Sequence, residues 1–164
     1  MRRGCLIVLL AITNIAAGQA AEFGARAMVI AQGETILETQ FQQGAVIRGI
    51  DFASFLEGPG GVQLFLNEVK GTPGLVGPSR FTSLGMGRGG QRVFLENLAE
   101  VQRAIEMQVP RGPLREALLG EAQSGGTIRL IGPSGFGVTS QGLGRIQGAT
   151  NRPVVILIVP PGAP

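Results

Sequence analysis

Two short apolar segments joined by a glycine-rich turn constrain the fold of this chain more than any other feature. Ile50, Phe52 and Ser54 alternate with two other residues, which is the period-2 pattern of a half-buried strand. The segment Gly58-Pro59-Gly60-Gly61 cannot continue a strand and favours a tight turn. After the turn, residues 62–66 alternate again. The sequence therefore predicts a strand, a turn and a second strand.

The N-terminus has the three parts of an export signal. Two arginines near the start are followed by an unbroken apolar run at residues 5–12, and Gly18-Gln19-Ala20 places small residues where a signal peptidase reads them. The run is shorter than the roughly 20 residues that span a membrane, although a retained membrane anchor is the alternative. We expect residues 1–20 to be a cleaved signal peptide and residues 21–164 to form a single β-rich domain.

The composition of the chain excludes several classes of function. It has 14 Lys and Arg residues against 11 Asp and Glu residues, and two of the arginines lie in the expected signal peptide. The mature chain is nearly neutral and has no basic cluster, so nucleic acid is not expected as a partner. His, Tyr and Trp are absent, and the one cysteine precedes residue 21. This excludes His-assisted nucleophiles and the usual zinc, copper and iron ligand sets.

Two kinds of enzyme site are left by this composition. One is a Ser–Lys dyad through Lys70, and the other is a glycosidase-like pair among Glu57, Glu68 and Glu96. Lys70 adjoins Gly71 in a polar turn, where a solvated surface lysine is the more ordinary interpretation. The glutamates cannot be paired from the sequence. We expect a protein that is not an enzyme and that carries no cofactor.

Glycine separates most of the apolar runs, with 27 residues in the chain, and this spacing favours a β-rich fold with many tight turns. Short strands are expected at residues 27–31, 35–39, 81–84, 127–131, 136–139, 144–146 and 153–159. The last of these is the most β-prone run and is expected to be a buried strand. Residues 85–90 match G-x-G-x-x-G, but without a strong preceding strand we expect a glycine-rich turn rather than a dinucleotide site.

One amphipathic helix is expected within the β-rich chain. Apolar residues recur at three- and four-residue steps from Leu95 to Val109, with charged residues between them, which predicts a helix at residues 95–109. Pro110 and Pro113 end it. Residues 114–122 fit either a second short helix or a strand and turn.

Four short motifs follow one another in a characteristic order. The matching residues are Ala45, Val46 and Ile47; then Ile50, Phe52, Ser54, Phe55, Gly58 and Gly60; then Leu66, Asn67, Val69 and Gly71; then Gly132, Pro133, Ser134 and Gly135. In this order they resemble the two-partner secretion domain, the haemagglutination-activity domain at the N-terminus of filamentous haemagglutinins. Phe52 stands where that family usually has Trp, and Glu68 stands where it usually has Arg. The last motif has an alternative placement at residues 79–97.

The resemblance implies a right-handed parallel β-helix, mainly β, in which the helix at 95–109 is an insertion. It also implies a secreted or cell-surface protein of the adhesin type, without enzyme activity, that passes through the periplasm. Its partners would be an outer-membrane barrel transporter and a host or cell-surface ligand, and the matched residues would serve folding and secretion.

A second hypothesis is a small periplasmic or surface β-domain that binds a partner or assembles into a fibre. In that case the strand at 153–159 completes the sheet of a neighbour.

Overall fold

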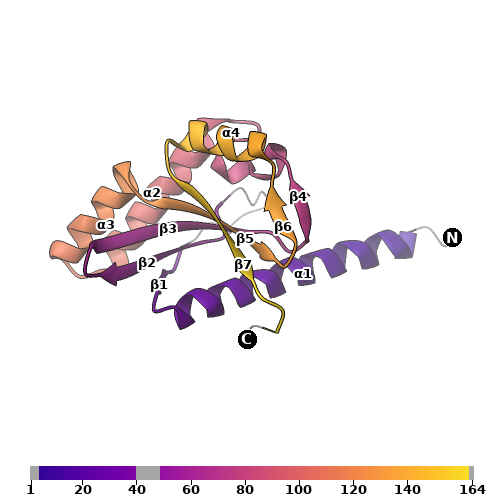
Figure 1. Ribbon diagram of the computed structural model, residues 1–164, viewed down its shortest axis with the longest axis horizontal. Helices are drawn as coiled ribbons and strands as arrows, with labels where there is room; N and C mark the ends of the chain where they lie inside the picture. Colours follow the sequence, from indigo (N-terminus) through magenta and orange to yellow (C-terminus); the bar gives the residue numbers. More distant parts are fainter. Residues whose placement is uncertain (1–3, 40–48, 163–164) are drawn as a thin grey trace.

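The computed structural model describes residues 4–39 and 49–162, and its centre is a five-stranded mixed sheet (Figure 1). The strand order is β1-β2-β3-β5-β7. The strands are β1 (Thr35–Leu37), β2 (Phe52–Gly58), β3 (Gly61–Val69), β5 (Thr127–Pro133) and β7 (Val154–Val159). β1, β2 and β3 are antiparallel to one another in turn, whereas β3, β5 and β7 run parallel. β4 (Gly74–Val76) and β6 (Phe136–Val138) form a separate parallel pair.

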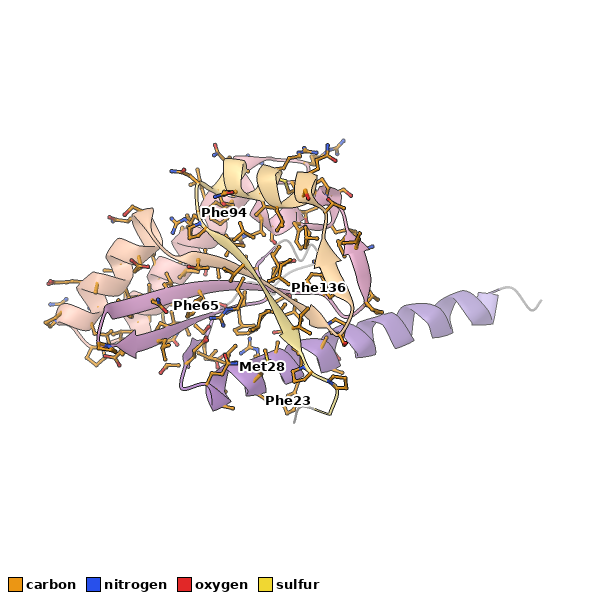
Figure 2. The ribbon with its side chains drawn as sticks, in the orientation of Figure 1. Phe23, Met28, Phe65, Phe94 and Phe136 are labelled. Carbon is orange, nitrogen blue, oxygen red and sulfur yellow. The ribbon has the colours of Figure 1, made fainter. Side chains whose placement is uncertain are left out.

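Helices cover both faces of the sheet. α1 (Gly4–Ala31) lies on one face, and α2 (Gln91–Gln108), α3 (Pro113–Ser124) and α4 (Ser140–Thr150) lie on the other (Figure 1). Two 3₁₀-helices, η1 (Pro78–Arg80) and η2 (Thr82–Leu84), lead toward α2. Each face has its own apolar core, and Figure 2 shows Phe94 on the side of α2 and Met28 on α1. The result is a three-layer α/β arrangement.

The predicted strand, turn and strand at residues 50–66 are confirmed as the β2–β3 hairpin. Phe52 pairs with Asn67, and the pairing continues to Gly58 opposite Gly61. Gly61 has a φ of 110°, a left-handed conformation that glycine adopts without steric cost.

The expected right-handed β-helix is wrong, because the chain folds into a mixed α/β structure. The connection from β3 to the parallel strand β5 carries α2 and α3, and the connection from β5 to β7 carries α4. Parallel neighbours need long crossovers of this kind, and a helix is the usual solution. The apolar faces of α2 and α3 supply much of one core, so these residues cannot be read as solenoid turns.

The helix expected at 95–109 is present as α2, but it is a crossover within the sheet and not an insertion. Residues 114–122, for which a helix and a strand were both considered, belong to α3.

Three expected strands are helical in the structure. Residues 27–31 end α1, residues 81–84 include η2, and residues 144–146 lie in α4. Apolar runs this short do not distinguish strands from buried helix segments. Ala45, Val46 and Ile47, the first of the motif matches, lie outside the described residues.

α4 forms in spite of its glycines because both of its ends are capped. Thr139 Oγ1 accepts a hydrogen bond from the Gly142 backbone N–H at 3.0 Å, which is a favourable N-cap. Asn151 ends the helix in the left-handed conformation with a φ of 52°. Arg152 then donates to the backbone oxygens of Glu121 and Ala122, at 2.8 Å each, near the end of α3. These contacts fix the point where β7 begins.

A buried polar network crosses the sheet on its α1 face. Arg129 Nη1 of β5 donates to Glu34 Oε1 at 2.8 Å, and both residues are over nine-tenths buried. Ser54 Oγ donates to Glu34 Oε2 at 2.6 Å, and Asn67 Nδ2 donates to Ser54 Oγ at 2.9 Å. The Arg129 guanidinium carbon lies 3.6 Å from the centroid of the Phe65 ring. The network therefore joins the end of α1 to β2, β3 and β5.

Removing one charge from this network should be strongly destabilising. We expect Arg129→Met to lower the free energy of unfolding by about 3–5 kcal/mol, because Glu34 would be left as a buried, uncompensated charge. Urea denaturation followed by circular dichroism measures the change.

The matched control is Arg92→Met, which breaks the exposed Arg92–Glu96 pair of α2. We expect it to change the free energy of unfolding by less than about 1 kcal/mol. Equal effects of the two substitutions would contradict a central role for the buried pair.

Candidate functional site

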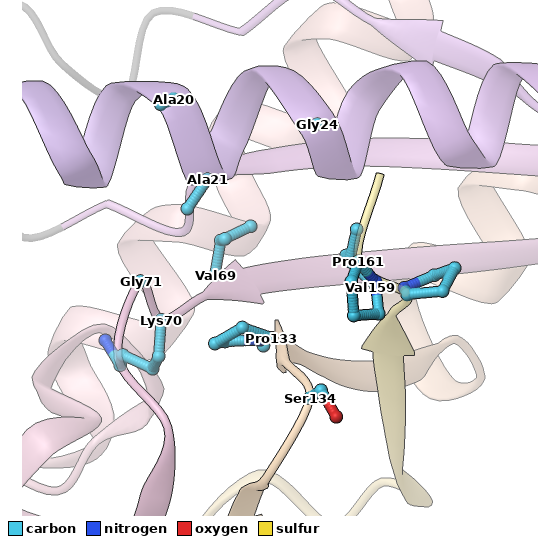
Figure 3. Close-up of a pocket in the computed structure, with 12 residues that line it drawn as sticks. Ala20, Ala21, Gly24, Val69, Lys70, Gly71, Pro133, Ser134, Val159 and Pro161 are labelled. Carbon is cyan, nitrogen blue, oxygen red and sulfur yellow. The ribbon is translucent and has the colours of Figure 1, made fainter. Parts of the chain in front are cut away.

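A cavity of about 340 Å³ lies where the carboxyl ends of β3, β5 and β7 meet α1 (Figure 3). Small residues of α1 form one wall, namely Ala20, Ala21 and Gly24. The strand ends form the others, with Val69, Lys70, Gly71, Gly132, Pro133, Ser134, Val159, Pro160 and Pro161. Ligands of open α/β sheets bind beyond the carboxyl ends of the strands. The walls are mostly apolar, so the position is that of a ligand site but polar groups that could orient a ligand are few.

Lys70 is held in a polar cluster beside this cavity. Its Nζ donates to Glu68 Oε1 at 2.7 Å and lies 5.1 Å from the centroid of the Phe81 ring. Ser83 Oγ donates to Glu68 Oε2 at 2.8 Å. Lys70 is thus an ion-paired, largely covered residue rather than the solvated surface lysine expected from the sequence. Ser83 is only 2% exposed, so this cluster fits a structural role better than a nucleophilic dyad.

Asp51 is the other titratable group of this region. Its Oδ2 accepts a hydrogen bond from the Val69 backbone N–H at 2.6 Å. The pKa of Asp51 is raised to about 8, and burial is the largest cause. The negative charges of Glu68 and Glu22 also raise this pKa, whereas the Val69 hydrogen bond and Lys70 lower it. The carboxyl group is therefore mainly protonated at neutral pH.

The three glutamates that were candidates for a glycosidase-like pair lie in different environments. Glu57 lies near the exposed end of the hairpin, and Glu96 lies on the exposed face of α2, where it pairs with Arg92. Glu68 is buried, and its carboxylate accepts hydrogen bonds from Lys70 and Ser83.

The residues matched to the secretion motifs separate into three groups. Ile50, Phe52, Ser54, Phe55, Leu66 and Asn67 are buried in or beside the hairpin. Val69, Gly71, Gly132, Pro133 and Ser134 line the cavity. Gly60 and Gly135 lie in exposed turns, and Gly58 is the exposed last residue of β2. Gly132 is packed so closely that an added Cβ would lie 2.1 Å from Phe136 Cγ.

The free edge of β7 is a second candidate site. β7 pairs with β5 on one side, and no other strand in residues 4–39 and 49–162 pairs with it. The sequence predicted a buried strand here, which is wrong: Val155, Ile156 and Ile158 are 44%, 38% and 39% exposed. β7 contains no charged residue and no proline. Edge strands usually carry such residues to prevent pairing with other chains.

The hydrogen-bond pattern shows which groups of β7 face outward. The Ile128 N–H donates to the Pro153 oxygen at 2.9 Å, and Ile128 is in register with Val154. In a parallel ladder, alternate residues of a strand direct both backbone groups to the same neighbour. Val155 and Leu157 therefore bond to β5, while Val154, Ile156 and Ile158 direct their N–H and C=O groups away from it.

Sequence reasoning missed Glu34, Asp51 and Arg129 as members of buried clusters. Arg129 alternates with apolar residues in β5, a pattern that suggests an exposed face, but α1 covers that face. Asp51 is the one aspartate of the chain and stands inside an apolar strand pattern, which is the signal that could have identified it.

In the part of the chain that the structure describes, no three His, Cys, Asp or Glu side chains gather as metal ligands would. None of the described helices has the length and apolar character of a membrane span. Comparisons with protein-family models, with curated proteins and with solved structures find no match for this chain.

Asp51 should make the fold less stable as the pH rises. Between pH values near 4 and near 8 the folded chain keeps a proton on Asp51 that the unfolded chain has lost. The free energy of unfolding should then fall with increasing pH, by at most about 1.4 kcal/mol per pH unit, and level off above the folded pKa.

We expect Asp51→Asn to flatten this dependence and to raise stability at pH 8, since the amide oxygen can still accept the Val69 N–H. Urea denaturation at pH 5 and pH 8 measures both effects. Glu57→Gln, which removes an exposed carboxylate, is the control. An unchanged pH dependence in Asp51→Asn would show that another group is responsible.

Proposed function

We propose that this protein is a non-catalytic binding or assembly subunit that joins a strand of its partner to the free edge of β7. The observation that carries this proposal is an uncharged, exposed, apolar edge strand with three outward-facing backbone residues, Val154, Ile156 and Ile158. In strand addition, main-chain hydrogen bonds provide affinity and alternate side chains provide specificity.

The energetics of strand addition are favourable at this edge. The three outward-facing residues offer three donors and three acceptors, and each hydrogen bond contributes about 0.5–1.5 kcal/mol net. Val155, Ile156 and Ile158 would lose exposed apolar surface at the same time, which contributes about 25 cal/mol for each Å² buried.

The polar clusters support a role without catalysis. Lys70, Glu68 and Ser83 satisfy one another in a buried position, and Arg129 and Glu34 are used to join the strands. A role as the secretion domain of a haemagglutinin-like exoprotein depends on a β-helix, and this chain has a different fold. We therefore favour the binding or assembly subunit over that role.

Export remains part of the proposal. Ala25 and Val29, the α1 residues that are fully buried against the sheet, follow the expected cleavage site after Ala20. Removal of residues 1–20 would keep their packing, so an exported, processed form is compatible with this fold.

A fluorescent peptide with the Val154–Val159 sequence, flanked by lysines for solubility, tests strand addition to the edge. We expect saturable binding to the full-length protein in fluorescence anisotropy, and at least tenfold weaker binding to Ile156→Pro. This proline removes an outward-facing N–H and should leave the bonds to β5 intact, because proline is tolerated where an edge N–H faces solvent.

Met107→Lys is the control, since it changes an exposed apolar residue of α2 that lies near Glu38 and Thr39, beside β1 at the opposite edge of the sheet. Its affinity for the peptide should equal that of the wild type. Thermal melts confirm that each variant is folded. The proposal is wrong if the peptide does not bind, or if it binds a folded Ile156→Pro variant as tightly as the wild type.

A further inference from the structure

We infer that the strand received by this edge is β7 of a second copy of the chain, paired antiparallel about a two-fold axis at Ile156. This inference rests on the proposed function and specifies its partner. It follows from the backbone pattern of the edge, from the side chains of β7 and from the prolines that bound it.

The backbone pattern selects this register. In an antiparallel pair, a residue with outward-facing N–H and C=O groups exchanges two hydrogen bonds with an opposite residue of the same kind. With the axis at Ile156, Ile156 of one copy faces Ile156 of the other copy, and Val154 faces Ile158. All three outward-facing residues of each copy are then paired.

Pro160 disfavours the register in which the two-fold axis passes through Leu157. An axis at Leu157 would place Val154 opposite Pro160, which has no N–H to donate. An axis midway between two residues would place odd-numbered residues opposite even-numbered ones. Opposed side chains would then belong to different faces of the sheet, so that neither core could continue across the junction. An axis at Val155 would place Ile158 opposite Arg152, which lies outside β7. The axis at Ile156 therefore uses the free edge most completely.

The side chains of β7 suit a copy of themselves. In this register Ile156 meets Ile156, Val154 meets Ile158 and Val155 meets Leu157, so every opposed pair is aliphatic. Like charges opposite each other destabilise a strand pair, but residues 153–160 carry no charge. A neutral, wholly aliphatic strand thus pairs with its own copy without electrostatic cost.

The two-fold axis makes the contact closed. Each β7 has one free edge, so two copies consume both edges and form a continuous ten-stranded sheet, an isologous pair. An interface of two short strands is at the small end of the range for specific contacts. We expect a dissociation constant on the order of micromolar.

Cysteine cross-linking in the full-length protein tests the register. In a Cys5→Ser background, Ile156→Cys places two cysteines directly opposite, with Cα atoms about 5.5 Å apart, which a disulfide can bridge. We expect most of the chain to migrate as a disulfide-linked dimer after mild oxidation. Val155→Cys is the control: its copies would be diagonal neighbours about 7–8 Å apart, and we expect little cross-linking.

A double variant, Val155→Cys with Leu157→Cys, should restore the cross-link, because these two positions face each other across the axis. Sedimentation equilibrium of Ile156→Lys without any introduced cysteine should show a shift toward monomer relative to the wild type, by at least tenfold in dissociation constant. Its melting curve shows whether it is folded.

The outcomes separate this inference from the proposed function. If Ile156→Cys stays uncrosslinked while the labelled peptide binds the wild-type protein, the edge accepts a strand but two copies do not pair in this register, and only this inference fails. If neither occurs, both fail. Equal cross-linking of Val155→Cys and Ile156→Cys would indicate non-specific association and would also overturn the inference.

Discussion

The buried ion pair between Glu34 and Arg129 is the interaction on which the arrangement of this sheet depends. The two residues are 95 positions apart in the sequence. Glu34 lies just before β1, the first of the antiparallel strands, and Arg129 lies in β5, one of the parallel strands. A charge buried between α1 and the sheet is costly unless it is paired and hydrogen-bonded. Ser54, Asn67 and the Phe65 ring provide the remaining contacts, so α1 and the four strands β1, β2, β3 and β5 are tied to one polar centre.

The sequence was sufficient for the local parts of this fold and insufficient for its topology. The β2–β3 hairpin and α2 follow from apolar periods of 2 and 3.6 residues, which are properties of one segment at a time. The parallel pairing of β3 with β5 joins Leu66 to Ile128 across more than sixty positions, and no local pattern encodes it. Reading the glycine spacing as solenoid turns led to the wrong fold, because the helical crossovers were treated as additions to a β structure.

The candidate sites show the same division. Ser54 and Asn67 were selected for a motif resemblance. In the structure Asn67 donates to Ser54, and Ser54 donates to Glu34, a member of an ion pair that was not selected. The apolar run of β7 was correctly identified as a strand, but its burial was not. A run of aliphatic residues indicates that a strand is suited to neighbours on both sides, and it does not say whether the second neighbour belongs to the same chain.

The glycines of α4 have a consequence for the order in which this molecule opens. Gly144 and Gly148 have no atom within 4 Å of the place where a Cβ would stand, so alanine would fit at both, and each glycine costs about 1 kcal/mol of helix stability relative to alanine. α4 is therefore a helix of low stability that is connected directly to β7. Amide hydrogens of α4 should exchange with solvent earlier than those of α2. Each such opening exposes the face of β7 that α4 covers, while the rest of the sheet stays folded.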